Sequence, residues 1–125
     1  MTNVRRAGHQ YERDIRLELI EIFKDDSIQT SRYASKELDD QKVDIYGTEK
    51  YGLYVQCKRY KNNPNLFEIL SSMPQVNGIM NTVFWKKPRV GEIVSMTKED
   101  FYSILNKLYG NQKTNTRRNK TDKNK

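Results

Sequence analysis

Two short apolar segments of the sequence each carry polar side chains of the kinds that bind metal ions and cleave phosphodiesters. Asp44 lies in the segment 43–46, and Gln56 and Lys58 lie in the segment 53–58. Both segments have the composition of β-strands, in which successive side chains point to opposite faces. Gln56 and Lys58 therefore share one face of their strand. If the two strands form a hairpin with aligned polar faces, Asp44 converges with both of them.

Such a cluster suits the metal-dependent hydrolysis of a phosphodiester, because a divalent ion needs oxygen ligands and the developing negative charge needs a cation nearby. Asp44 would supply an anionic oxygen and Gln56 an amide oxygen, and the backbone carbonyl of Cys57 lies on the same edge of the strand. Lys58 would orient or deprotonate the attacking water and stabilise the transition state. The alternative is a surface Asp–Lys pair on a solvated sheet face.

A carboxylate also lies inside an apolar helical stripe near the start of the chain. The apolar residues of this stripe recur at helical spacing and are Tyr11, Ile15, Leu19, Ile22 and Phe23. At about 100° per residue, Glu12 falls between Ile15, Leu19 and Phe23 rather than on the polar side. It either pairs with Arg16 at i,i+4 on the margin of the stripe or points past the helix toward a metal site.

Local patterns predict the elements that position these residues. The expected order is a helix over 8–24, a strand over 27–33, a loop over 35–42, a hairpin of strands 43–46 and 53–58, a helix over 66–73, strands 82–85 and 92–96, and a helix from 98 that Thr97 caps and Gly110 ends. Helices and strands in this order predict an α/β fold, in which helices flank a mixed central β-sheet.

The charge of the chain is concentrated near its end. The 125 residues suit one domain, and we expect it over 1–110, followed by a disordered basic tail over 111–125 that lacks large apolar residues. Six Lys and Arg residues oppose Asp122 in this tail, so the tail carries +5 of the formal net charge of +7. A Lys and Arg excess favours a polyanionic partner, although the tail alone does not distinguish DNA from RNA or an acidic membrane surface.

The remaining composition restricts the compartment and the chemistry. Cys57 is the only cysteine, which excludes an intrachain disulfide and fits a reducing compartment. No apolar run approaches the roughly 20 residues of a membrane span, and no signal-peptide apolar region is present, so we expect a cytoplasmic protein that does not associate with membranes. His9, the only histidine, is expected to be exposed, and the Cys57 side chain is expected in the core rather than as a nucleophile.

Four short motifs occur in a characteristic order. They are Gly8-x-x-Tyr11-Glu12-Arg13, Arg32-x-x-Ser35, Val43-Asp44-Ile45 and Val55-Gln56-Cys57-Lys58. Together they resemble the archaeal-type and phage Holliday junction resolvases, which belong to the PD-(D/E)xK superfamily. The similarity spans roughly Arg6 to Tyr60, about half of the chain.

The resemblance implies a restriction-endonuclease-like fold and a Mg²⁺-dependent nuclease in which Mn²⁺ can substitute. The first-helix acid, strand acid, second acid and lysine of the family fall on Glu12, Asp44, Gln56 and Lys58. Ser35 matches a serine near the scissile phosphate. The implied metal ligands are Asp44, Gln56, the Cys57 carbonyl and Glu12, and the candidate DNA-binding residues are Arg13, Arg32, Arg59 and Lys61.

One position departs from the resolvase pattern, because Gln56 stands where most of these enzymes have Glu. A Gln-x-Lys sequence is similar to the type IV restriction enzymes related to Mrr. The resolvase resemblance as a whole implies a homodimer that cleaves branched DNA, since two symmetric cuts need two sites, with no small-molecule cofactor. A phage-encoded enzyme acting in the host cell fits the small size. The alternatives are a restriction-like Mrr-type endonuclease and a non-catalytic nucleic-acid-binding protein of the same fold.

Overall fold

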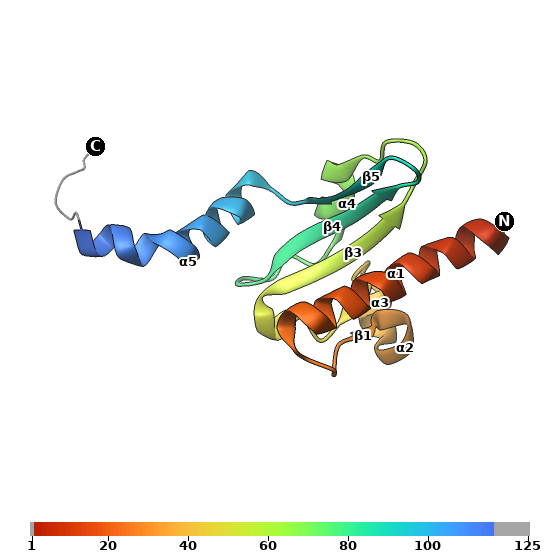
Figure 1. Ribbon diagram of the computed structural model, residues 1–125, viewed down its shortest axis with the longest axis horizontal. Helices are drawn as coiled ribbons and strands as arrows, with labels where there is room; N and C mark the ends of the chain where they lie inside the picture. The colour runs from red at the N-terminus through yellow and green to blue at the C-terminus, as the bar shows by residue number, and fades with distance from the viewer. Residues whose placement is uncertain (1, 117–125) are drawn as a thin grey trace.

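The computed structural model describes the backbone of residues 2–116 and the side chains of residues 4–110 (Figure 1). It is a mixed α/β structure with a three-stranded mixed sheet, a smaller two-stranded sheet and helices around them. The elements are α1 (Thr2–Phe23), β1 (Gln29–Thr30), α2 (Ser31–Ala34), α3 (Lys36–Asp40), β2 (Ile45–Tyr46), the 3-10 helix η1 (Glu49–Tyr51), β3 (Leu53–Arg59), α4 (Leu66–Ser72), β4 (Met80–Lys87), β5 (Gly91–Ser95) and α5 (Lys98–Thr116). Within residues 2–116, no helix is both long and apolar enough to cross a membrane.

The central sheet has the strand order β3-β4-β5. β3 and β4 are parallel, with Leu53 opposite Met80 and Lys58 opposite Trp85. Parallel neighbours need a crossover connection, and α4 supplies it. β5 returns antiparallel to β4 through a tight turn and forms the edge of this sheet. The predicted helix at 66–73 and the predicted strands at 82–85 and 92–96 are thus confirmed, with the strands lengthened or shifted by a few residues at their ends.

The predicted hairpin between segments 43–46 and 53–58 is wrong in its pairing. β2 pairs antiparallel with β1, with Thr30 opposite Ile45, whereas β3 pairs with β4. A backbone hydrogen bond from Asp44 N to Val55 O (2.8 Å) still joins the two predicted strands. The predicted turn over 47–52 contains the 3-10 helix η1, and the strands on its two sides belong to different sheets. Asp44 itself precedes β2.

Short helices occupy much of the region predicted as a strand over 27–33 and a loop over 35–42. Only Gln29–Thr30 is extended, and α2 and α3 follow it. Ser35 ends α2 and caps α3, because its side-chain oxygen accepts a hydrogen bond from Leu38 N at 3.2 Å. Leu38 is partly buried against the core, so tertiary packing stabilises a helix in a segment of polar composition.

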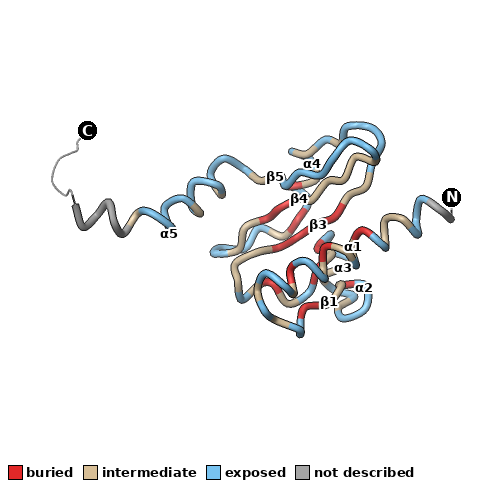
Figure 2. The backbone as a smooth tube through the Cα atoms, in the orientation of Figure 1, coloured by how far each residue is buried: buried red, intermediate tan, exposed pale blue. Residues whose placement is uncertain are grey.

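Two apolar cores lie on the two faces of the sheet. The first contains Tyr11, Ile15, Leu19, Ile28, Ile45, Val55 and Cys57, and joins α1 to β3. The second contains Val43, Tyr54, Leu70, Met73 and Val83, and joins α4 to β3 and β4. Figure 2 shows the buried backbone concentrated where these strands and helices meet. Because Val55 and Cys57 face α1 and Tyr54 faces α4, alternation puts Gln56 and Lys58 together on the α4 face, as predicted.

Both long helices differ from their predicted bounds. α1 begins at Thr2 rather than near Gly8, and Ile22, which helical spacing predicts in the apolar stripe, is 68% exposed. The predicted cap of α5 is confirmed, because Thr97 Oγ1 accepts a hydrogen bond from Asp100 N at 3.1 Å. α5 does not end at Gly110. It continues to Thr116, because Gly110 lacks the positive φ that a helix-terminating glycine adopts. Residues 117–125 of the predicted tail lie outside the described residues.

Candidate active site

Asp44 lies against the edge of β3, directly beside Gln56. Its backbone N donates to Val55 O at 2.8 Å, and its side-chain Oδ2 accepts a hydrogen bond from Cys57 N at 2.7 Å. These two contacts flank Gln56 on the strand. The N–H and C=O of one strand residue point to the same edge, so the Cys57 carbonyl oxygen faces the side on which Asp44 lies. The structure therefore places Asp44 at the edge of β3 to which the Cys57 carbonyl also points, with Gln56 on the strand between its two contacts.

Burial dominates the electrostatics of Asp44. It raises the pKa of this carboxyl from 3.8 to about 6, against the lowering effect of the Cys57 N–H. The charge of Glu12 raises the pKa further, and the charge of Lys58 lowers it. The charges of Glu12 on α1 and Lys58 on β3 thus both influence the pKa of the Asp44 carboxyl. A carboxyl group shifted by burial and by specific charged neighbours is typical of functional sites.

Glu12 pairs with a cation that local spacing did not suggest. Its Oε1 and Oε2 accept hydrogen bonds from Arg32 Nη2 at 2.8 and 3.0 Å, while the Glu12 side chain is only 12% exposed. Burial raises the Glu12 pKa, and Arg32 opposes that rise. The alternative i,i+4 partner, Arg16, instead donates from Nε to Ile28 O at 2.8 Å. Glu12 therefore faces the region of Arg32 and Asp44 rather than its own helix margin.

The Gln56 side chain is nearly buried, with 4% of its surface exposed, and its Oε1 accepts no hydrogen bond within the described part of the chain. A buried polar oxygen without a partner costs about 1–3 kcal/mol, so such atoms call for an explanation. A hard cation is a suitable partner, because Mg²⁺ and Mn²⁺ bind carboxylate, amide and carbonyl oxygens. Tyr11, Ser31 and Asn81 also have one unpartnered buried oxygen each. Gln56 differs from them because it lies beside Asp44.

The candidate oxygen donors near Gln56 are of three kinds: carboxylate, amide and backbone carbonyl. Among the described side chains, no group of three or more His, Cys, Asp or Glu residues gathers in a metal-binding arrangement. The candidate set instead combines the carboxylates of Asp44 and Glu12 with the Gln56 amide oxygen and the Cys57 backbone carbonyl. This composition fits a hard divalent cation. The Cys57 thiol is buried in the α1 core, and burial raises its pKa well above the ordinary value, which argues against a nucleophilic role.

A basic pocket opens on the outer side of Glu12. It has a volume of about 450 Å³ and is lined by His9, Glu12, Arg13, Arg16, Gln29, Thr30, Arg32 and Tyr33. It thus unites Arg13 and Arg32, two of the four predicted DNA-binding residues. Burial and the charges of Arg32, Arg5 and Arg13 lower the His9 pKa, which keeps this imidazole neutral near pH 7. The pocket therefore presents arginine cations beside the site.

The other two predicted DNA-binding residues, Arg59 and Lys61, lie at the far end of β3, next to cations that sequence reasoning missed. Arg59 is opposite Lys86 in the parallel ladder, and Tyr60 N donates to Lys86 O at 3.2 Å. The turn after β4 adds Lys87 and the exposed Arg89. The sequence Lys86-Lys87-Pro88-Arg89 displays these cations but predicts only a turn. It does not show that β4 pairs with β3 in the register that places them beside Arg59.

Aromatic side chains accompany these cations. Trp85 Nε1 donates to Tyr60 O at 3.3 Å, and Lys58 Nζ lies over the Tyr60 ring, 5.6 Å from its centroid. Lys58 is therefore held at the boundary between the Asp44 site and the basic end of β3. Ser35, in contrast, uses its side-chain oxygen as the cap of α3. Its hydroxyl proton stays available for a further hydrogen bond.

Comparison of the chain with protein-family models, with curated proteins and with solved structures finds no match. The site itself therefore carries the functional assignment. Its features are a partly buried carboxylate at a strand edge and an unpartnered buried amide oxygen on that strand. A helix carboxylate and a lysine both act on the pKa of the strand-edge carboxylate, and basic residues lie at either side.

Proposed function

We propose that the chain is a metal-dependent DNA endonuclease of the PD-(D/E)xK superfamily, with a restriction-endonuclease-like fold. One observation carries the proposal: the Asp44 carboxyl is partly buried against β3 beside Gln56 and feels the charges of Glu12 and Lys58. The resolvase motifs imply acids and a lysine close together on a helix and two strands; here Glu12 lies on α1, Asp44 directly precedes β2, and Lys58 lies on β3. A structural role alone accounts for it poorly, because burying a carboxylate costs free energy of folding.

The proposed catalytic residues divide the work of phosphodiester hydrolysis. Mg²⁺, or Mn²⁺ in its place, would be held by Asp44, Gln56 Oε1, the Cys57 carbonyl and Glu12, and would supply Lewis acidity at the scissile phosphate. The Lys58 ammonium stabilises the negative charge that develops on the phosphate and orients the attacking water. Ser35 donates its hydroxyl proton to a phosphate oxygen.

The proposed substrate is DNA, most specifically a branched junction. Arg13 and Arg32 line the pocket next to Glu12, and Arg59 and Lys61 continue the basic surface beyond Lys58. Backbone contacts of this kind position a duplex without reading its sequence. A homodimer would present two such sites and make two symmetric cuts.

Gln56 supports a second candidate function. A Gln-x-Lys site is the pattern of Mrr-related enzymes, which cleave modified duplex DNA, and the unpartnered Gln56 oxygen fits a ligand role in either class. The two candidates share the chemistry and differ in the DNA they select. A non-catalytic DNA-binding protein of the same fold is the third outcome.

One assay separates these candidates. The full chain is incubated with end-labelled four-way junction, flap, plain duplex and cytosine-methylated duplex DNA of matched sequence, with Mg²⁺ and with EDTA. Mg²⁺-dependent cutting of the junction in preference to both duplexes supports the resolvase. Preferential cutting of the methylated duplex supports the restriction-like enzyme, and binding without any cutting contradicts the nuclease proposal.

A further inference from the structure

An apolar stripe on α5 is exposed along the length of its described side chains. Phe101, Leu105 and Leu108 recur at i, i+4 and i+7, and they are 47%, 36% and 60% exposed. Figure 1 shows α5 leaving the body of the molecule. Lys107 lies on the other side of the helix and reaches the turn at Gly52, where an added Cβ would lie 4.0 Å from its Nζ. Phe101, at the start of the stripe, borders the body, and Leu105 and Leu108 continue the stripe along the exposed part of the helix.

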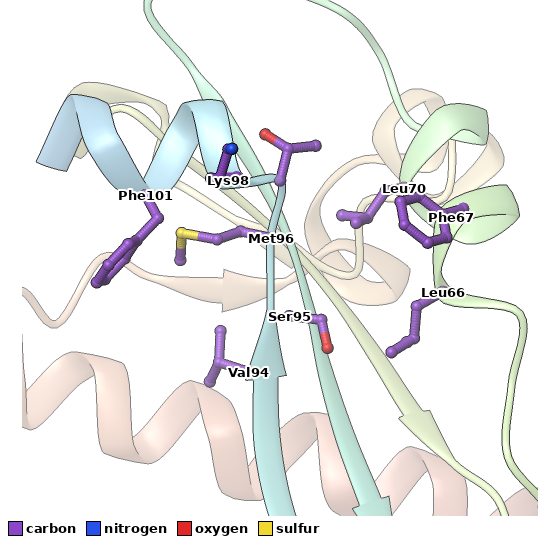
Figure 3. A pocket seen from close by; sticks show the side chains of 9 residues that line it. Leu66, Phe67, Leu70, Val94, Ser95, Met96, Lys98 and Phe101 are labelled. Atoms are coloured by element: carbon purple, nitrogen blue, oxygen red, sulfur yellow. The ribbon is translucent and has the colours of Figure 1, made fainter.

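An apolar groove lies at the base of the same helix. It has a volume of about 570 Å³ and is lined by Leu66, Phe67, Leu70, Val94, Ser95, Met96, Thr97, Lys98 and Phe101. Figure 3 shows the α4 residues Leu66, Phe67 and Leu70 on one side and Val94, Met96 and Phe101 on the other. Phe67 is 83% exposed, a large apolar ring held in solvent beside an open groove. Within the described residues nothing covers this face.

The residues that follow α5 in the sequence do not suit the groove. Residues 117–125, which follow α5, read Arg-Arg-Asn-Lys-Thr-Asp-Lys-Asn-Lys and contain no apolar side chain. An apolar groove of this kind takes an apolar helix, and the chain carries one in α5 itself. α5 cannot fold back into the groove, because its own first turn lines it. A second copy can supply the helix.

We propose that two copies of the chain associate through α5, with the two helices antiparallel and the distal half of each in the groove of the other. When the helices cross midway between Ile104 and Leu105, position 101 of one copy faces position 108 of the other. Leu108 then meets Phe101 on one side of the groove, and Phe67 borders the opposite side. Each copy thus covers the stripe and the groove of its partner, which is the self-complementarity that a twofold interface requires.

The charges of α5 favour this antiparallel direction. Its first turn holds Lys98, Glu99 and Asp100 and is acidic on balance, and Lys107 lies in the following half. In an antiparallel pair the acidic turn of one helix lies near the basic half of the other, and the two helix dipoles also oppose each other. A parallel pair would align like charges. This assembly does not depend on the proposed nuclease activity.

The test is the oligomeric state of the full chain, measured by sedimentation velocity up to about 100 µM, where micromolar association is fully developed. The wild type is expected to sediment as a dimer. Leu108→Glu changes the helix side and Phe67→Glu the groove side, and each should raise the dissociation constant at least about 100-fold, as for a central interface residue. Ile22→Glu, an equally drastic change at an exposed position of α1, is the matched control and should leave the dimer intact.

Three results would overturn the proposal: a monomeric wild type, a dimer that either Leu108→Glu or Phe67→Glu leaves intact, or a dimer that Ile22→Glu dissociates. Urea unfolding followed by Trp85 fluorescence checks that each variant retains a folded sheet. Both variants replace exposed side chains, so at protein concentrations low enough for wild type to be monomeric, all three proteins should unfold at the same urea concentration. Because no DNA is present, a failed interface and a failed nuclease assignment give separate results.

Discussion

At Asp44 the proposed function conflicts with the stability of the fold, because the carboxylate that would bind a metal ion is costly to bury. Its pKa in the folded chain, about 6, lies above the ordinary 3.8, so folding takes up a proton between these two pH values. The free energy of unfolding therefore falls as the pH rises through this window and stays low above it. The rise in pKa corresponds to at most about 3 kcal/mol at neutral pH.

Asp44→Asn should consequently stabilise the metal-free protein. We expect a higher free energy of unfolding at pH 7.5 in EDTA, by up to about 3 kcal/mol, and no difference from wild type below about pH 4. Urea titrations at both pH values measure it. Asp26→Asn, at an exposed carboxylate, is the control and should change little. If Asp44→Asn is less stable than wild type at pH 7.5, the Asp44 carboxylate stabilises the fold. The claim that it lowers the free energy of unfolding would then be wrong.

Gln56 gives the second prediction at this scale. A neutral amide adds no charge to a cation site, so Mg²⁺ should bind less tightly than at a two-carboxylate site. Gln56→Glu should keep nuclease activity and lower the Mg²⁺ concentration for half-maximal rate. Gln56→Ala should raise that concentration or abolish cutting. Mg²⁺ titrations of single-turnover cleavage compare the three proteins, and identical curves for wild type and Gln56→Ala would remove Gln56 from the ligand set.

Residue-level reasoning from the sequence identified some contacts and not others. Strand alternation correctly predicted that Gln56 and Lys58 share a face, because a period of two depends only on local structure. The partner of Glu12 was missed. Local spacing suggested Arg16, but the pairing residue is Arg32, 20 positions away, which only the tertiary path of β1 and α2 brings to α1.

Among the elements, the turn between β4 and β5 is the clearest candidate for a DNA contact that the sequence did not reveal. Replacing Lys87 and Arg89 together by Gln should weaken DNA binding. It should also lower the slope of log affinity against log salt by about 0.9 for each duplex phosphate that the variant no longer neutralises. Fluorescence anisotropy in EDTA over a range of salt concentrations measures both effects.

A matched control removes the same charge elsewhere. Lys24→Gln with Lys50→Gln changes two cations in surface ion pairs with Glu21 and Asp25. Both lysine side chains are more than half exposed, so this double variant should keep the wild-type salt slope, and urea unfolding checks that it stays folded without the Lys50 contact to the largely buried Asp25. If the two double variants lower the slope equally, the turn has no specific role and only net charge matters.

Elements with strong periodicity were predictable, and those stabilised by packing were not. α1, α4, β4 and β5 follow apolar patterns that the sequence displays. α3 lies in a polar segment and depends on the Ser35 cap and on the packing of Leu38, so composition alone indicated a loop. The pairing of β2 with β1 could not be predicted from local patterns either. The sequence does not show that the loop containing η1 leaves β2 to pair with β1.

At the scale of the whole molecule, the site lies where two cores meet. α1 covers one face of the sheet and α4 the other, and Asp44 contacts the edge of β3 that does not pair with β4. The sequence predicted the α/β class and the order of the main elements. It could not predict that α5 projects from the body, because an apolar helical stripe is equally compatible with packing on its own sheet.

The central claim is that Asp44 and Lys58 act in phosphodiester cleavage and not in holding DNA. The direct measurement is single-turnover cleavage of the DNA that wild type cuts best, paired with anisotropy binding in EDTA, for Asp44→Asn and Lys58→Ala. Asp26→Asn and Lys50→Ala serve as matched controls. We predict that both site variants lose at least about 100-fold in cleavage rate while they keep DNA binding, and that both controls cut normally. Wild-type cleavage by either purified site variant would contradict this claim.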